Sequence, residues 1–85
     1  MANPAKILAW LKEAGARAYE LEESDHPGGR LFIDILVGGS TAGVRVRGAD
    51  RQEYSCLTWS EIESAEANPL LRLIDVTIAA VEKKS

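Results

Sequence analysis

The sequence predicts an α+β domain: an antiparallel β-meander of three or four strands, with an N-terminal helix and one short plus one long C-terminal helix packed on one face. Two observations predict this class. The middle of the chain consists of short segments rich in alternating or branched apolar residues, separated by glycine-containing turns. Both ends carry apolar residues at helical spacing, each after an Asn-Pro pair. The expected order is α-β-β-β-β-α-α, in a single domain spanning residues 1–85.

Composition limits the classes of function. With 46% hydrophobic and 27% charged residues among 85, the chain has the composition of an ordinary globular domain. A net charge of −3 disfavours nonspecific binding to nucleic acid, which depends on neutralising phosphates. No apolar run approaches the roughly 20 residues of a membrane span, and the first residues lack the zones of a signal peptide. We therefore expect a cytoplasmic protein with no membrane partner.

The first helix is expected to begin at Pro4, with Asn3 as its N-cap. Its apolar residues recur at helical spacing, which indicates an amphipathic helix of about three turns. Gly15 is expected to end this helix as a left-handed C-cap. The apolar residues are Ile7, Trp10, Leu11 and Ala14.

Four strands are expected after this helix, because each segment alternates or is rich in branched side chains. They cover residues 17–23, 30–37, 44–47 and 53–57, and the turns between them cover 24–29, 38–43 and 48–51. The segment 30–37 is the most apolar, so we expect it to be the central strand. Its buried face consists of Leu31, Ile33, Ile35 and Val37, and Phe32, Asp34 and Leu36 lie on the other face.

The C-terminal helices have clear start signals. Thr58 and Glu61 have the spacing of a capping box, which predicts a short helix over residues 59–67. Asn68 and Pro69 then start the last helix, which is expected to run into Lys83-Lys84. Its polar stripe is narrow and contains Arg72, Asp75, Val76, Ala79 and Glu82.

So broad an apolar surface on the last helix predicts contacts on two sides, with the sheet and with either the first helix or another subunit. We therefore expect a two-fold homodimer through the last helix. Within one chain, a shared core is expected for Leu31, Ile33, Ile35 and Val44 of the strands with Ile7, Leu11, Ile74 and Val81 of the helices.

No residue set points to catalysis, a metal or a cofactor. His26 is the only histidine and lies in a Pro-Gly turn, where a turn role is expected. Cys56 is the only cysteine, and the single cysteine leaves no internal disulfide. It would be a nucleophile only if His26 approached it, and a small buried apolar role is favoured. The glycine-rich segment 38–43 lacks the Lys-Ser/Thr ending of a phosphate-binding loop and leads into a strand, so a hairpin loop is favoured.

The order of a helix, strands and a helix, with Tyr19 to Glu23 and a turn before a strand that contains Phe32, resembles a double-stranded-RNA-binding domain over the first half of the chain. The resemblance implies a lysine cluster at the start of the last helix. That place holds residues 68–72, with Arg72 as the one basic residue. The phosphate-binding element of the family is therefore missing, and the family is not adopted.

The face of the sheet opposite the helices is the candidate binding site. It is expected to gather Glu20 and Glu22 with Phe32, Asp34, Leu36, Arg45 and Arg47. Cross-strand ion pairs explain the charged residues but not the two large apolar side chains. The sequence therefore predicts a non-catalytic protein-interaction domain whose partner-binding residues are Phe32, Asp34, Leu36, Arg45 and Arg47. By analogy, small accessory or inhibitor proteins of phages and mobile elements have this character.

Two alternatives remain open at this point. The first is a nucleic-acid-binding module that uses Arg45, Arg47 and Phe32. The second is a small enzyme, which would need Cys56 or His26 in a pocket and is the least favoured.

Overall fold

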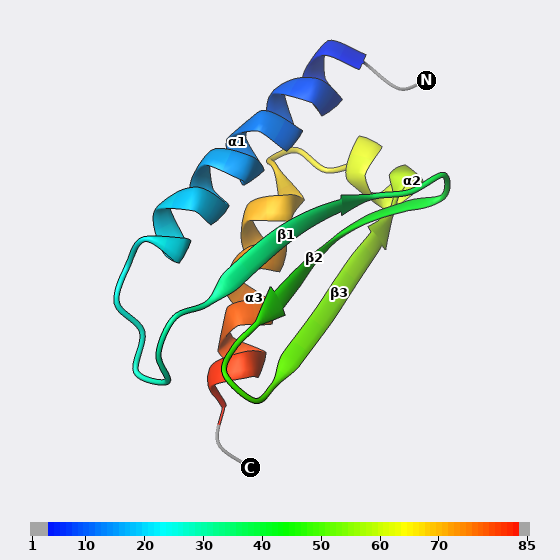
Figure 1. Ribbon diagram of the computed structural model, residues 1–85. Helices are drawn as coiled ribbons and strands as arrows, with labels where there is room; N and C mark the ends of the chain where they lie inside the picture. Colours follow the sequence, from blue (N-terminus) through cyan, green and yellow to red (C-terminus); the bar gives the residue numbers. More distant parts are fainter. Residues whose placement is uncertain (1–3, 84–85) are drawn as a thin grey trace.

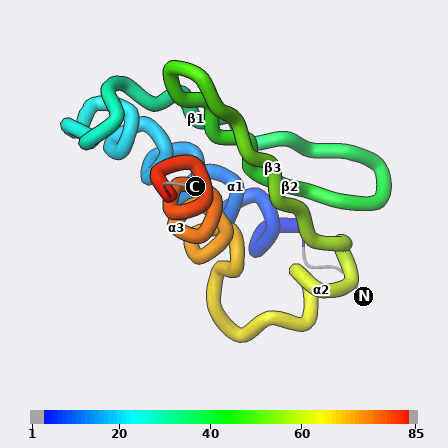
Figure 2. Tube along the Cα trace, turned by 90° about the horizontal axis from the view of Figure 1, so that it is seen from below, coloured from blue at the N-terminus to red at the C-terminus, as the bar shows by residue number. Residues whose placement is uncertain are grey.

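The computed structural model describes residues 4–83, which form a helix, three strands and two further helices in that order (Figure 1). These are α1 (Pro4–Glu22), β1 (Phe32–Val37), β2 (Thr41–Arg47), β3 (Gln52–Thr58), α2 (Trp59–Glu63) and α3 (Pro69–Glu82). Both long helices, α1 and α3, lie on one side of the sheet (Figure 2). The predicted α+β class is confirmed, with three strands. Within the described residues, every helix is too short or too polar to cross a lipid bilayer.

The predicted strand over residues 17–23 is wrong, because this segment is the second half of α1. Ala14, Ala18 and Leu21 continue one helical stripe at spacings of four and three, and both alanines are buried. Gly15 therefore lies inside the helix and is not its C-cap. A glycine there costs about 0.5–1 kcal/mol relative to alanine. The packing of α1 against β1 and α3 offsets that cost.

The sheet is antiparallel with the order β1-β2-β3, so the expected central strand is an edge strand and β2 is central. Since residues 17–22 are helical, β1 has a strand neighbour on one side only. The predicted loop over 38–43 is also too long. β2 begins at Thr41, and the N–H of Gly38 donates to the Thr41 carbonyl at 2.8 Å to close a short hairpin. The Trp59 indole donates to the Gly38 carbonyl at 2.9 Å and holds that turn against α2.

The capping box at the start of α2 is confirmed. The Thr58 hydroxyl accepts from the Glu61 N–H at 3.2 Å, and the Glu61 carboxylate accepts from the Thr58 N–H at 2.9 Å. The helix ends at Glu63 and does not continue to residue 67. Ser64 explains this early end, because its hydroxyl donates to two carbonyl oxygens of the helix and competes with further helical bonds.

Asn68 caps α3 as predicted, since its side chain accepts from the Leu70 N–H at 3.0 Å. Its amide nitrogen also donates to the Trp10 carbonyl at 3.0 Å and to the Glu13 carboxylate at 2.9 Å. This one side chain therefore joins the start of α3 to the middle of α1. The expected N-cap at Asn3 and the expected extension to Lys84 lie outside the described residues.

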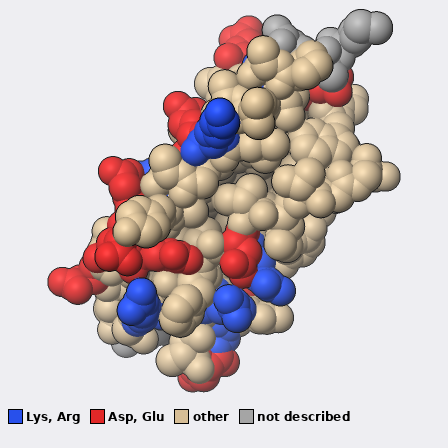
Figure 3. Space-filling model, turned by 45° about the horizontal axis from the view of Figure 1, so that its top comes forward, with Lys and Arg blue, Asp and Glu red and all other residues tan. Residues whose placement is uncertain are grey.

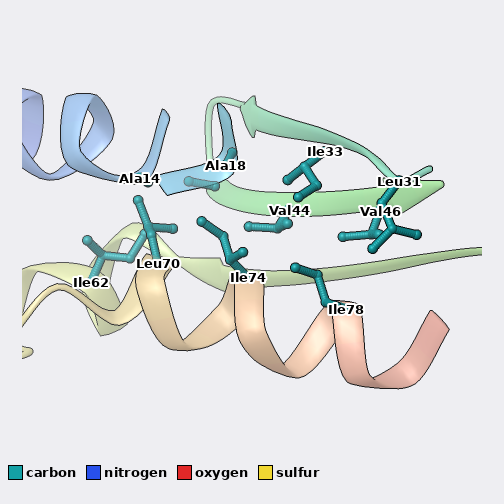
Figure 4. Close-up of a cluster of buried hydrophobic side chains, with 11 residues drawn as sticks. Ala14, Ala18, Leu31, Ile33, Val44, Val46, Ile62, Leu70, Ile74 and Ile78 are labelled. Carbon is teal, nitrogen blue, oxygen red and sulfur yellow. The ribbon is translucent and has the colours of Figure 1, made fainter. Parts of the chain in front are cut away.

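The core lies between the sheet and the two long helices. Ile33, Val44 and Val46 point from the sheet toward Ile74 and Ile78 of α3 (Figure 4). Most of the predicted core is confirmed, although its members differ in depth. Leu31, Ile33, Val44 and Ile74 are buried, and Ile7, Leu11, Ile35 and Val81 are partly buried against them. The predicted polar stripe of α3 is exposed at Arg72, Asp75, Val76, Ala79 and Glu82.

Candidate binding face

The candidate site is the face of the sheet that α1 and α3 leave open, here called the outer face (Figures 1 and 2). Strand side chains alternate, so the neighbours of the buried residues in each strand point to this side. All five predicted partner-binding residues lie on it. The outer face comprises Phe32, Asp34 and Leu36 of β1, Thr41, Gly43, Arg45 and Arg47 of β2, and Gln52, Tyr54, Cys56 and Thr58 of β3.

The carboxylate of Asp34 organises the charges of the outer face. Asp34 and Arg45 are cross-strand partners, and Asp34 Oδ2 accepts from Arg45 Nε at 3.1 Å and from Arg45 Nη2 at 2.9 Å. Arg47 Nη2 approaches the same oxygen at 3.5 Å. Two guanidinium groups thus share one carboxylate. Arg45 is firmly held, whereas Arg47 keeps an exposed side chain, and within residues 4–83 no second carboxylate balances its charge.

Phe32 is the aromatic residue of this cluster, and 45% of it is exposed. Its ring lies between two cations: the guanidinium carbon of Arg30 is 5.5 Å from the ring centroid, and that of Arg47 is 5.7 Å from it. The nearest acidic contact of Arg30 is Glu23 at 3.9 Å, between two exposed side chains. Cation–π contact orients both guanidiniums, and the side chains of Arg30 and Arg47 stay 67% and 47% exposed. In the lower half of Figure 3, Lys or Arg side chains lie beside Asp or Glu side chains.

A shallow hollow of about 420 Å³ opens beside Phe32 and Arg47, where the outer face meets the turn between β2 and β3. Gln52 and Arg51 line its other side. Arg51 is fixed there, because its guanidinium donates to the Lys83 carbonyl and lies 3.8 Å from the Glu53 carboxylate. The hollow places an apolar wall and guanidinium groups around one space.

Leu36 lies in the next part of the face, in one row with Gly43 and Cys56. A Cβ at Gly43 would lie 2.5 Å from the Ser55 carbonyl oxygen and 2.9 Å from the Cys56 Cβ. Glycine is therefore needed at this position for β2 and β3 to approach. Its missing side chain leaves one flank of Leu36 uncovered. The sequence expectation that Cys56 is buried is wrong, because it lies exposed on the outer face.

Tyr54 is the main residue of the face that the sequence reasoning missed. It is 53% exposed and lies directly across from Arg45. The pKa of its phenol is raised above the ordinary value of 10.0, mainly by a hydrogen bond with the Cys56 side chain. The alternation of Gln52, Tyr54 and Cys56 was a usable signal. This alternation holds for the predicted strand 53–57 as well, but Glu53 and Ser55 on the opposite face are more polar, so polarity alone points Tyr54 and Cys56 to the wrong side.

Glu20 and Glu22 do not belong to the outer face, contrary to the expectation. Both lie on α1, which extends to Glu22. The Glu22 carboxylate accepts from the N–H of Ile33 at 2.6 Å, on the side of β1 that faces away from β2. Glu22 therefore supports the edge of the sheet, whereas Glu20 pairs with Arg17 of the same helix.

His26 and Cys56 are not brought together. The His26 ring is nearly buried between α1 and α3, with Nε2 2.6 Å from the Leu21 carbonyl oxygen and Nδ1 3.2 Å from the Glu82 carboxylate. These contacts tie the ends of the two helices through the loop. Among residues 4–83, no three His, Cys, Asp or Glu side chains are grouped to hold a metal ion.

Comparisons of the chain with protein-family models, with curated proteins and with solved structures find no match. The class of the molecule therefore follows from its own features: a small α+β domain with one open sheet face that carries aromatic, apolar and guanidinium groups.

Proposed function

We propose that the protein is a small non-catalytic protein-interaction domain that binds a protein partner through the outer face. One observation carries the proposal. Phe32 is a large exposed aromatic residue flanked by the guanidiniums of Arg30 and Arg47, on a sheet face that no other described element covers. Aromatic and arginine residues dominate the binding energy of protein interfaces.

The roles of the site residues follow from their contacts. Phe32 and Leu36 are the apolar anchors. Arg47, which is only loosely held by Asp34, contributes a charge for an incoming carboxylate. Asp34 and Arg45 satisfy one another and fix the orientation of the neighbouring side chains. The favoured partner is thus a protein segment with an apolar side chain next to an acidic one. Binding such a segment would suit a small cytoplasmic accessory or inhibitor protein.

The test is a comparison of two double variants in affinity capture from an extract of the source cells, read by quantitative mass spectrometry. Phe32→Ser with Arg47→Glu changes the outer face. Tyr19→Ser with Lys12→Glu makes the same kinds of change on exposed positions of α1. Both variants are expected to keep the circular dichroism spectrum of the wild type. Arg45 is left intact, because a glutamate there would oppose Asp34 and disturb the sheet itself.

If the proposal is correct, the wild type and the α1 variant capture a partner protein that the outer-face variant does not capture. The purified candidate should then bind with at least about tenfold lower affinity to the outer-face variant. Equal capture by all three chains would place the binding site elsewhere.

A nucleic-acid-binding function is the second candidate, and one observation favours it. Phe32 and Tyr54 are both exposed on a face that also carries Arg45 and Arg47, and aromatic residues beside cations form stacking platforms for single-stranded nucleic acid. The net charge of −3 opposes it. Fluorescence anisotropy with single-stranded oligonucleotides at two salt concentrations separates the candidates. Affinity that falls steeply with salt and is lost with Phe32→Ser would favour this second function.

A further inference from the structure

The two edges of the sheet differ in how their backbone groups are satisfied. The bonds from the Gly48 N–H to the Arg51 carbonyl and from the Trp59 N–H to the Ser40 carbonyl continue the β2–β3 ladder at its two ends. Antiparallel strands alternate inward and outward backbone groups. By this alternation, Gln52, Tyr54, Cys56 and Thr58 point their backbone N–H groups away from β2.

Of these outward N–H groups of β3, the one at Thr58 is used by the Glu61 carboxylate. Within residues 4–83, no other residue bonds to the outward backbone groups of Gln52, Tyr54 and Cys56. The edge of β1 is partly occupied, because the Glu22 carboxylate accepts from the N–H of Ile33, and within residues 4–83 the outward N–H groups of Ile35 and Val37 have no partner. β3 is therefore the edge with the longer open stretch, because three successive outward positions, Gln52, Tyr54 and Cys56, have no partner within residues 4–83.

β3 also lacks the features that protect edge strands from pairing. Its seven residues keep continuous register with β2, without a bulge, and contain no proline or lysine. Its one charged residue is Glu53, which points to the helix side. Such a strand is a template for the addition of another strand.

A second surface, the free flank of α3, lies beside this edge. An ion pair from Arg17 to Asp75 at 4.0 Å, and the 3.2 Å contact with Glu82 of His26 in the loop after α1, place α1 along one side of α3. α1 packs on β1, and α3 packs on β2 and β3, so the opposite side of α3 borders the open edge. That side carries Leu73, Val76 and Ala80, spaced by three and four residues. Val76 is 50% exposed, and Leu73 and Ala80 are partly buried.

We propose that a second copy of this chain docks on this composite surface. β3 pairs with β3 of the other copy in antiparallel register about a two-fold axis, and the free flanks of the two α3 helices meet. The two three-stranded sheets then form one sheet of six strands. The inference is independent of the proposed function, although it would join the two outer faces into one surface with Tyr54 near its centre.

A second copy fits this surface because the surface is self-complementary. Two-fold pairing supplies each unsatisfied N–H and C=O of one β3 with the matching group of the other. Glu53 is the one charged residue of β3, so like charges meet only in the register that places Glu53 of one copy opposite Glu53 of the other. Every other register keeps the two carboxylates from facing each other. The two α3 helices would run in opposite directions. The positive end of each helix dipole would then lie nearer the negative end of the other, which is favourable. The apolar flank then packs on an equally apolar surface.

The first test measures the molar mass by sedimentation equilibrium from about 1 to 500 μM under reducing conditions, so that Cys56 cannot link two copies. The wild type is expected to reach twice the chain mass of 9.2 kDa. Val76→Lys should raise the dissociation constant by about tenfold or more, because it places a charge in the apolar contact. Ala79→Lys, which makes the same change on the exposed side of α3, is the matched control and should leave the constant unchanged.

The second test asks whether the strands pair. The amide protons of Tyr54 and Cys56 should exchange slowly at a concentration at which the chain is dimeric and rapidly in the dilute monomer. Those of Ser55 and Leu57 point to β2 and should be protected in both. A wild type that stays monomeric at 500 μM, or equal effects of the two lysine variants, would overturn the proposal. So would a dimer in which the amides of Tyr54 and Cys56 remain unprotected.

Discussion

At the scale of single residues, this protein depends on side chains that complete a local backbone arrangement. Gly43 permits the close approach of β2 and β3, Asn68 joins α3 to α1, and Glu61 completes the start of α2. Each acts on main-chain groups of an element end or of a neighbouring strand. The outer face is thus held in shape by residues that do not belong to its aromatic and guanidinium cluster.

Glu61 gives a pH-dependent prediction. The N–H and hydroxyl of Thr58 hold the pKa of its carboxyl below the ordinary value of 4.5. A lowered folded-state pKa adds stability that is present above the ordinary pKa and is lost as the pH falls through the folded pKa. Glu61→Ala should therefore melt at a lower temperature than the wild type at pH 7. The difference should shrink as the pH falls below 4.5. A difference in melting temperature that is constant from pH 7 to pH 3 would show that the charge of Glu61 contributes nothing.

At the scale of elements, α1 is the clearest case of packing that overrides a local signal. A glycine followed by an alternating segment is typical of a helix end and a strand. The helix continues because Ala14 and Ala18 are small enough to bring α1 close to its neighbours, and both are fully or almost fully buried. A longer helix also carries Glu22 to the edge of β1, where it occupies a free N–H.

Because residue 15 lies inside a helix, the effect of replacing Gly15 by alanine on the stability of the protein can be predicted. No atom lies within 4 Å of a Cβ placed on Gly15, and its φ is not positive. Gly15→Ala should therefore stabilise the protein by about 0.5–1 kcal/mol, seen as a higher urea midpoint. Gly29→Ala is the contrasting variant, since Gly29 has a φ of 98° and alanine there should destabilise. Destabilisation by Gly15→Ala would mean that the helix ends near this residue after all.

At the scale of the whole molecule, the core is a single layer between one sheet and two helices. The more deeply a side chain lies in that layer, the more unfolding free energy should be lost when it is shortened to alanine. Ile74 is fully buried at the centre of α3, where it faces Val44 and Leu70 (Figure 4). Ile35 lies on the strand at the edge of the sheet and is partly exposed. Both belong to the predicted core, but only the first is enclosed on all sides.

Ile74→Ala is expected to cost about 2–5 kcal/mol of unfolding free energy, a large share of the stability of so small a domain. Ile35→Ala should cost clearly less, because the edge can relax and water already reaches the side chain. Urea titrations of both variants measure the difference. Equal losses would mean that the edge formed by β1 is as enclosed as the centre of the layer, as it would be if another chain covered it.

The sequence by itself determined the features that short segments encode. Its turn residues, the capping box at Thr58, the cap at Asn68 and the alternation of β1 and β2 each depend on neighbours within a few positions. For the same reason, five of the outer-face residues could be predicted from alternation alone. Tyr54 and Cys56 were missed because they are less polar than Glu53 and Ser55 on the opposite face of the same strand, so the local pattern favours burying them.

Only the tertiary structure decided the state of residues 17–23, the order of the strands and the exposure of Cys56. Leu21 fits both an alternating strand and a helix whose stripe continues from Ala14 and Ala18, so this residue does not separate the two, and Tyr19 is 66% exposed in the helix that forms. The choice was made by contacts of α1 with β1 and α3. Which strand is central, and which edge is left open, likewise depends on pairings between distant segments, because hydrogen bonding and burial there are properties of the assembled sheet.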